Sequence, residues 1–307
     1  MATNLPQITS VFSKLISTAV FVVSDMLKFF SSLSYRSRRR LLYPLLSFVM
    51  TVSLVVGIAQ ASQASLFDII LNGIQVIQLS NISNNQEVQI GKQINSELVG
   101  SEIRLYRNPE INRYVNDLGQ RLAQHSKRPD IPYTFQVVND KSINAFATMG
   151  GFVYVNAGLL AAADNEAQLA SVMAHEIGHI AARHAIQQMR QAAVQQGIAS
   201  AAGLDRNTLV NIGVKMALQL PNSRKDELQA DQLGLQTLEK TGYAPSAMVA
   251  FMEKLLKAGG SVPTFLSSHP ATQDRIKALQ QAIDPATADR GAGLDTVAYK
   301  NKIRALL

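Results

Sequence analysis

The sequence contains no cysteine, and this absence removes several classes of function at the outset. Without thiols the chain cannot form disulfides, build a thiolate zinc site, use a cysteine nucleophile or carry a lipoprotein-type anchor. The absence says little about the compartment, because an oxidising compartment permits disulfides without requiring them. With 307 residues, 47% of them hydrophobic, the chain is long enough to bury a sizeable core in one or two domains.

Excess positive charge is scarce outside the first 61 residues. The whole chain carries +7, but residues 1–61 hold six Lys or Arg side chains against one Asp, which contributes 6 − 1 = +5. The remaining residues have 29 − 6 = 23 basic and 22 − 1 = 21 acidic side chains, a balance of +2. The basic character therefore belongs to the N-terminus, and we expect no nucleic-acid partner for the main body.

Residues 41–59 lack any charged side chain and follow a cationic cluster at Arg36 to Arg40. Small residues at 59–64 then resemble an A-x-A cleavage site, so the stretch predicts a cleaved secretory signal. The apolar run is also just long enough to cross a bilayer, and an uncleaved membrane anchor is the alternative. In both cases the arginines stay cytoplasmic, and the rest of the chain is expected on the extracytoplasmic side, either released or anchored at the membrane.

The sequence has no internal repeat, and its patterning predicts an α+β fold that is mainly helical with a small β-sheet. The predicted domains are a targeting region (1–64), a main domain (65–285) and a polar C-terminal tail (286–307) that is expected to be loosely held. Helices are predicted for residues 83–99, 109–125, 164–196 (with Asp164 as N-cap), 224–241, 245–258 and 272–283, and strands for 133–138, 145–147 and 152–155. Residues 197–220 contain charges that exclude a membrane span, and they predict either a mobile flap or a helix beneath a cleft.

The motif H-E-x-x-H at residues 175–179 lies inside the helix predicted for 164–196. Positions four apart share one helix face, so His175 and His179 can bind the same metal ion. Two neutral imidazoles suit zinc, and Glu176 stands next to them as a candidate general base for a water on the open side of the metal. The motif therefore predicts a metallopeptidase centre, although a chance match is the alternative for a pattern this short.

Catalytic zinc usually has three protein ligands, so the chain must supply one more. His184 lies nine residues after His175, which on a continuous helix places it on the opposite side, and we expect a structural or ligand-supporting role for it. Glu227 on the separate helix 224–241 is the better candidate for the third ligand. Asp231, one turn later, is suited to accept a hydrogen bond from the outer nitrogen of a ligand histidine. Solvated surface carboxylates are the alternative interpretation of this pair.

Beyond the motif, several stretches match a known family. They are residues 142–147, 150–160, 166–170 and 174–184, then Ser223 and Arg224 through Glu227 and Asp231, and finally 268–270 with Arg275. Over about residues 83–285 the chain resembles the gluzincin zinc endopeptidases related to the heat-shock protease HtpX and the CaaX prenyl protease. It is most similar to their soluble periplasmic branch, the beta-barrel assembly-enhancing proteases.

The resemblance implies a zincin-type domain with the sheet over the active-site helix. His175, His179 and Glu227 would bind one zinc ion, Glu176 would be the catalytic base, and Asp231 would support a ligand or donate a proton. His269 would lie on a loop that can approach the metal and close the site, with Arg275 following at the matching place. Thr148-Met149 and Asn222 depart from the usual residues, which affects the expected cleft geometry and substrate preference but not the zinc site.

The sequence thus predicts a zinc-dependent endopeptidase of the cell envelope. The resemblance implies unfolded or misassembled envelope proteins as substrates, with membrane association through the N-terminal segment. A rival hypothesis is a non-proteolytic envelope chaperone that keeps zinc for structure and has its site closed by His269. A weaker third hypothesis is a membrane-anchored scaffold in which the motif is accidental.

Overall fold

The computed structural model describes residues 82–195, 206–219, 222–257, 264–270 and 273–307. The targeting region predicted for 1–64, including the apolar run 41–59, lies outside these residues. Among the described helices, none is both long and apolar enough to cross a membrane.

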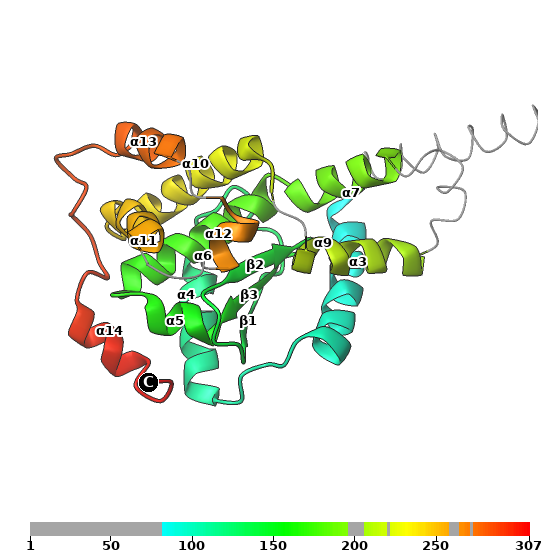
Figure 1. The fold of residues 1–307 in the computed structure, drawn as a ribbon, viewed down its shortest axis with the longest axis horizontal. Helices are drawn as coiled ribbons and strands as arrows, with labels where there is room; N and C mark the ends of the chain where they lie inside the picture. The colour runs from blue at the N-terminus through cyan, green and yellow to red at the C-terminus, as the bar shows by residue number, and fades with distance from the viewer. Residues whose placement is uncertain (1–81, 196–205, 220–221, 258–263, 271–272) are drawn as a thin grey trace, which may run out of the picture. The chain divides into compact units, whose positions relative to one another are not determined.

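The described part of the chain is mainly helical with one small sheet, as predicted (Figure 1). Most predicted elements are observed within about three residues of their expected ends. In chain order the elements are α3 (Asn84–Glu97), the π-helix η1 (Leu98–Glu102), α4 (Pro109–Gln124), β1 (Thr134–Val138), β2 (Ala145–Thr148), β3 (Phe152–Asn156), α5 (Ala157–Ala162), α6 (Glu166–Ala181), α7 (His184–Gln195), α9 (Arg206–Gln219), α10 (Arg224–Lys240), α11 (Ser246–Lys257), α12 (Thr264–Ser268), α13 (Gln273–Ala282) and α14 (Thr296–Lys302).

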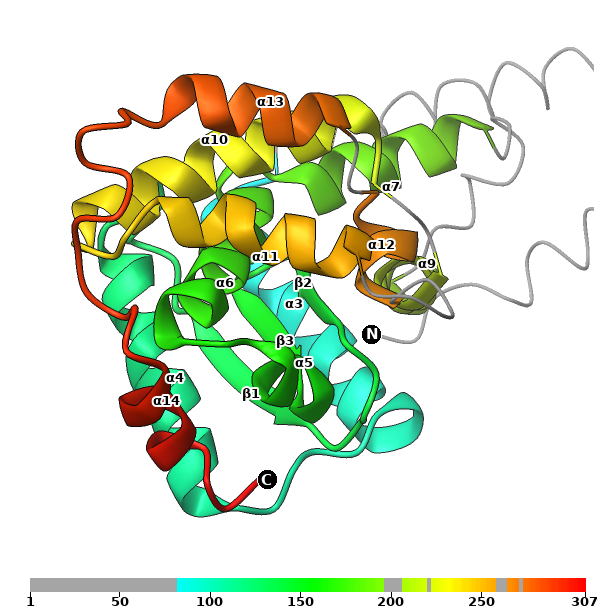
Figure 2. The same ribbon diagram turned by 60° about the vertical axis from the view of Figure 1, so that its left-hand side comes forward.

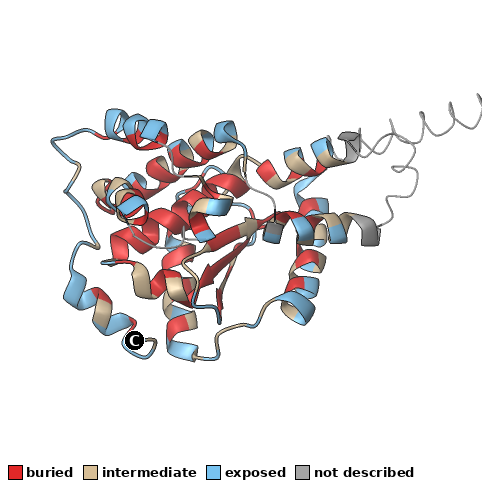
Figure 3. Cartoon of the chain, viewed as in Figure 1, coloured by how far each residue is buried: buried red, intermediate tan, exposed pale blue. Residues whose placement is uncertain are grey.

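The sheet has three strands in the order β1-β3-β2, with β3 parallel to β1 and antiparallel to β2. Every residue of β3 is buried, because both faces of the sheet are covered (Figure 3). Val153 and Val155 face the core formed with α4, α6 and α10, whereas Phe152 and Tyr154 face the layer of α3, α7 and α9. The order of the strands makes β2 an edge strand, and β2 contacts α6.

Helices α6 and α10 pack closely along their lengths, and glycines permit this approach (Figure 2). A Cβ atom at Gly178 would lie 2.6 Å from the carbonyl oxygen of Ala230, and one at Gly234 would lie 3.0 Å from the backbone of His175. Real Cβ atoms do not approach this closely, so larger residues would push the two helices apart. The sequence therefore brings the H-E-x-x-H helix against the helix that carries Glu227 and Asp231.

The prediction of a single helix over 164–196 is wrong, because α6 ends at Ala181 and a separate helix, α7, begins at His184. Arg183 adopts φ 59°, in the left-handed region that ends a helix. Its guanidinium donates to the carbonyl of Ile82 at 2.6 Å and lies 3.1 Å from the buried carboxylate of Glu87. The N-cap of α6 is Asn165, which accepts from the amide of Gln168, rather than the predicted Asp164.

The C-terminal tail is not loosely held, contrary to the prediction. Tyr299 and Ile303 are buried, and the Tyr299 hydroxyl donates to the carbonyl of Leu160 at 2.6 Å. Lys302 forms an ion pair with Glu166 at the start of α6. The amphipathic tail helix α14 therefore contributes to the core that supports α6.

For 197–220, the described residues 206–219 form the helix α9, which contacts α3, α7 and β2.

Candidate metal centre

The two histidines of the motif converge from one face of α6. The Nε2 atoms of His175 and His179 lie 3.0 Å apart, and both side chains are buried. Their helix is buried along almost its whole length between the sheet and α10. Such a rigid, packed element can hold ligands in fixed positions.

Glu227 and His269 complete a group of four buried ligand atoms. The Glu227 carboxylate lies 3.4 Å from His175 Nε2 and 3.2 Å from His179 Nε2. His269, directly after α12, places its Nδ1 atom 3.0 Å from Glu227 Oε1 and 3.3 Å from His175 Nε2. All four ligand atoms lie within 4.8 Å of one another. The helix-borne carboxylate predicted from the sequence therefore lies beside the histidine pair.

The spacing and charge of this group fit a bound divalent metal. In a tetrahedron the ligand atoms are about 1.6 times the bond length apart, or about 3.3–3.4 Å for metal–nitrogen bonds of about 2.0–2.1 Å. The distances of 3.0–3.4 Å above are close to this value. Fully ionised, the buried carboxylates of Glu176, Glu227 and Asp231 and the guanidinium of Arg275 sum to 1 − 3 = −2, which a divalent cation balances.

Asp231 and Arg275 support the His175 side of the group. Asp231 Oδ1 lies 2.9 Å from the outer nitrogen of His175, and it accepts from Arg275 Nη2 at 2.6 Å. Arg275 Nη1 also lies 2.6 Å from Glu227 Oε2. Burial alone would lower the pKa of His175, but the carboxylates of Glu227 and Asp231 outweigh burial and raise it to about 10. The position of His175 is therefore one that attracts positive charge.

His179 is supported by an imidazole instead of a carboxylate. Because the chain turns at Arg183, His184 does not face away as a continuous helix would require, and its Nδ1 lies 2.9 Å from His179 Nδ1. His184 Nε2 lies 3.1 Å from Gln229 Oε1, an oxygen that only accepts, so Nε2 carries a proton. With Nε2 as the donor, His184 Nδ1 is the acceptor for His179 Nδ1, which leaves His179 Nε2 unprotonated toward the centre. Burial lowers the pKa of His179 to about 3.

Glu176 lies at the edge of the ligand group without belonging to it. Both of its carboxylate oxygens are buried and have no hydrogen-bond partner, and Oε1 lies 3.4 Å from His269 Nε2. Burial raises the pKa of Glu176, which the nearby histidines partly oppose. A buried carboxylate of raised pKa that has no hydrogen-bond partner can accept a proton from a nearby water molecule.

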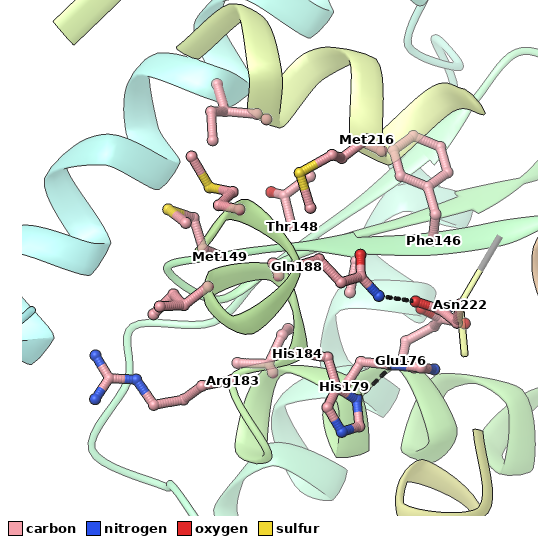
Figure 4. A pocket seen from close by; sticks show the side chains of 18 of the residues that line it. Phe146, Thr148, Met149, Glu176, His179, Arg183, His184, Gln188, Met216 and Asn222 are labelled. Carbon is pink, nitrogen blue, oxygen red and sulfur yellow. Dashed lines mark hydrogen bonds between the residues drawn. The ribbon is translucent and has the colours of Figure 1, made fainter. Parts of the chain in front are cut away.

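A pocket opens beside Glu176 and His179, lined by α3, α7, α9 and β2 (Figure 4). Its wall is largely apolar, with Phe146, Met149 and Met216 among the lining residues. Polar groups enter it at the metal end, where Gln188 Nε2 donates to Asn222 Oδ1 at 2.7 Å. The sequence analysis did not predict the contact between Gln188 and Asn222, because no motif includes both residues, although Asn222 departs from the usual residue at its position.

Comparison with known proteins agrees with this geometry. Residues 109–283, more than half of the chain, match the model of Peptidase family M48. The beta-barrel assembly-enhancing protease of Escherichia coli is 34% identical over 214 residues, which covers 64% of this chain and 44% of that protein. The mitochondrial metalloendopeptidase OMA1 of Arabidopsis thaliana is 37% identical over 165 residues, covering 52% of this chain and 33% of that protein.

The chain thus spans less than half the length of these curated relatives. The resemblance inferred from the motifs is nevertheless confirmed, and so is the prediction of a metallopeptidase domain with an α+β fold. The family model, the relatives and the buried ligand group all support the same assignment. The chain belongs to Peptidase family M48.

Proposed function

We propose that the protein is a zinc-dependent endopeptidase that hydrolyses peptide bonds through a water molecule activated by Glu176. The observation that carries this proposal is the buried, unpartnered carboxylate of Glu176 beside a group of four ligand side chains. A site that served structure alone would have no need of a free buried base, and burying one costs stability.

His175, His179 and Glu227 would hold one zinc ion per chain. The donor set supports this choice, because imidazole and carboxylate ligands at near-tetrahedral spacing suit zinc. When bound, zinc would polarise the scissile carbonyl and lower the pKa of a water molecule to about 7.

Glu176 would then move the protons of the reaction. Its carboxylate accepts a proton from the attacking water as the water oxygen forms a bond with the carbonyl carbon. The carbonyl π electrons move to oxygen, giving a tetrahedral oxyanion. Glu176 next passes the proton to the amide nitrogen, the C–N bond breaks, and the amine product leaves. The raised pKa of Glu176 makes its carboxylate a stronger base toward the attacking water.

Asp231 and Arg275 would position ligands and would not touch the substrate. Hydrogen bonds from Arg275 and the nearness of His175 outweigh burial and lower the pKa of Asp231, which therefore remains a carboxylate and is unsuited to donate a proton. The charge of Arg275 is directed at Asp231 and Glu227, so it neutralises carboxylates instead of reaching outward.

We infer an extracytoplasmic location and envelope protein substrates that are unfolded or misassembled. The cationic cluster and apolar run at residues 36–59 support export or anchoring at the membrane. The name of the E. coli relative, which links that protein to beta-barrel assembly, supports an envelope substrate.

A second candidate is a zinc-containing chaperone without proteolytic activity. The position of His269 favours it, because structural zinc sites usually fill all four positions with protein ligands. In this hypothesis Glu176 has no catalytic role and His269 keeps the site closed.

Zinc content and proteolysis of the purified chain separate the two functions. The enzyme predicts about one zinc per chain and cleavage of an unfolded protein such as casein, with activity about 10²–10⁴-fold lower in Glu176→Gln. The matched control is Glu253→Gln on α11, which should change neither. Zinc retained with no cleavage, even in His269→Ala, would favour the chaperone, and absence of zinc would contradict both.

A further inference from the structure

We propose that Asn222 is a further catalytic residue, whose side-chain amide donates a hydrogen bond to the oxyanion of the tetrahedral intermediate. This inference rests on the proposed peptidase function.

The amide of Asn222 is oriented by Gln188. Gln188 Nε2 donates to Asn222 Oδ1 at 2.7 Å, and the same nitrogen lies 3.5 Å from a carboxylate oxygen of Asp226, which can only accept. Both contacts require the Gln188 amide nitrogen on this side. The oxygen of Asn222 therefore accepts from Gln188, and its NH₂ group lies on the side of His269.

The NH₂ group faces the position that His269 occupies among the ligands. Asn222 Nδ2 lies 3.3 Å from His269 Nδ1, the atom that is 3.0 Å from Glu227 Oε1. A catalytic zinc site keeps one such position for water or substrate. When His269 withdraws, a substrate oxygen in its place would lie about 3.3 Å from a preoriented N–H donor.

That distance suits a donor that acts mainly in the transition state. Donors to an oxyanion lie about 2.7–3.1 Å from the place where the charge develops, and such contacts are often longer before the reaction. Asn222 is also well anchored, since its backbone amide donates to Ser268 at 3.0 Å and Ser223 directly after it caps α10. A donor on a fixed support needs little rearrangement as the charge forms.

A competing explanation is that Asn222 only holds His269 in the closed position. The two explanations differ once His269 is gone. In a His269→Ala parent, a latch has nothing left to hold, whereas an oxyanion donor still acts. The test therefore uses the full chain with His269→Ala, its zinc content measured, and a quenched-fluorescence peptide taken from its casein cleavage sites.

We expect Asn222→Leu in this parent to lower kcat about 10²–10³-fold with KM nearly unchanged. Calorimetry should show weaker binding of a phosphinic peptide, a mimic of the tetrahedral intermediate, by a similar factor, with zinc content unchanged. Asn222→Asp keeps the size of the side chain but loses the donor, so its kcat should fall by a similar factor. Gln188→Glu should lower kcat less, because it only removes the hydrogen bond that orients the Asn222 amide. Asn112→Leu on α4 is the matched control.

Unchanged kcat and phosphinic-peptide affinity in Asn222→Leu and Asn222→Asp would overturn the proposal while leaving the peptidase function intact. Faster turnover of Asn222→Leu in the chain that retains His269, with no effect in the His269→Ala parent, would establish the latch instead. A zinc-loaded parent that cleaves nothing would refute the proposed function, and this inference with it.

Discussion

The two histidines of the H-E-x-x-H motif have different supports at their outer nitrogens although they lie one helical turn apart. Both contact Glu227, but His175 also has the carboxylate of Asp231 at its outer nitrogen, and its pKa is raised to about 10. His179 has the neutral imidazole of His184 behind it, and burial lowers its pKa to about 3. One ligand thus lies on an anionic side of the centre and the other on a neutral side.

Helices α10 and α7 therefore support the ligand group in different ways. The anionic side comes from α10, whose Glu227 and Asp231 carry the charges that would balance a metal, and Arg275 offsets part of this charge. The neutral side comes from α7, which orients an imidazole without adding charge. Removing a support from each side should therefore change stability and metal affinity in different proportions.

The largest effect is expected for Asp231→Asn on the anionic side. The substitution leaves the buried guanidinium of Arg275 short of a carboxylate, so the unfolding free energy should fall by about 3–5 kcal/mol. Zinc affinity should fall about 10–100-fold because His175 loses its anionic support. Thermal unfolding without metal and chelator competition measure the two effects, and wild-type values in both would contradict the anionic side described above.

A smaller effect with a different pattern is expected for His184→Leu on the neutral side. Zinc affinity should fall about 10–100-fold, because His179 loses the acceptor that fixes its tautomer. Metal-free stability should fall much less than in Asp231→Asn, because no buried ion pair is broken. The control is His125→Leu at the exposed end of α4. A larger stability loss than in Asp231→Asn would contradict the distinction between the two sides.

Gly178→Ala tests whether both sides depend on the close packing of α6 on α10. The added Cβ would lie 2.6 Å from the Ala230 carbonyl oxygen, so we expect a loss of about 1–3 kcal/mol and weaker zinc binding. Gly100→Ala, where a Cβ would meet no atom within 4 Å, is the control. Urea unfolding of both variants checks the prediction, and equal midpoints would show that the packing tolerates the extra methyl group.

The smallest effect is expected for Lys302→Met, which removes an exposed cation from Glu166. The Lys302 side chain is 48% exposed, in contrast to 1% for Arg275, so the unfolding free energy should fall by about 0.2–1 kcal/mol.

Burial opposes ionisation of Glu166, but hydrogen bonds from Lys302 and two tyrosines lower its pKa. A lowered pKa gives stability above the unfolded value of about 4.3 that is lost as pH falls through the folded value. The difference between the thermal midpoints of the variant and the wild type should therefore be present at pH 7 and vanish in acid. A difference that persisted in acid would contradict the ion pair as its source.

Local patterns in the sequence were enough for the motif, the strands and most helices. The spacing of His175 and His179 depends only on helix geometry, and the match at Glu227 narrowed the search for a partner helix. The fold class and the approach of these three side chains followed from such signals.

Local patterns did not predict the contact of His184 with His179 or the burial of the C-terminal tail. Arg183 is neither glycine nor proline, and its left-handed backbone is accompanied by contacts with Ile82 and Glu87, about a hundred residues earlier. The residue types near Arg183 therefore do not predict that α6 ends before His184. The tail looked polar because only one face of α14, with Tyr299, is buried.

X-ray absorption at the zinc edge of the purified chain measures the atoms that surround the metal. We predict a four-coordinate shell of nitrogen and oxygen atoms at about 2.0–2.1 Å, with imidazole scattering, and loss of zinc from Glu227→Gln. A six-oxygen shell, or full zinc binding by Glu227→Gln, would contradict a centre built from two imidazoles of α6 and one carboxylate of α10.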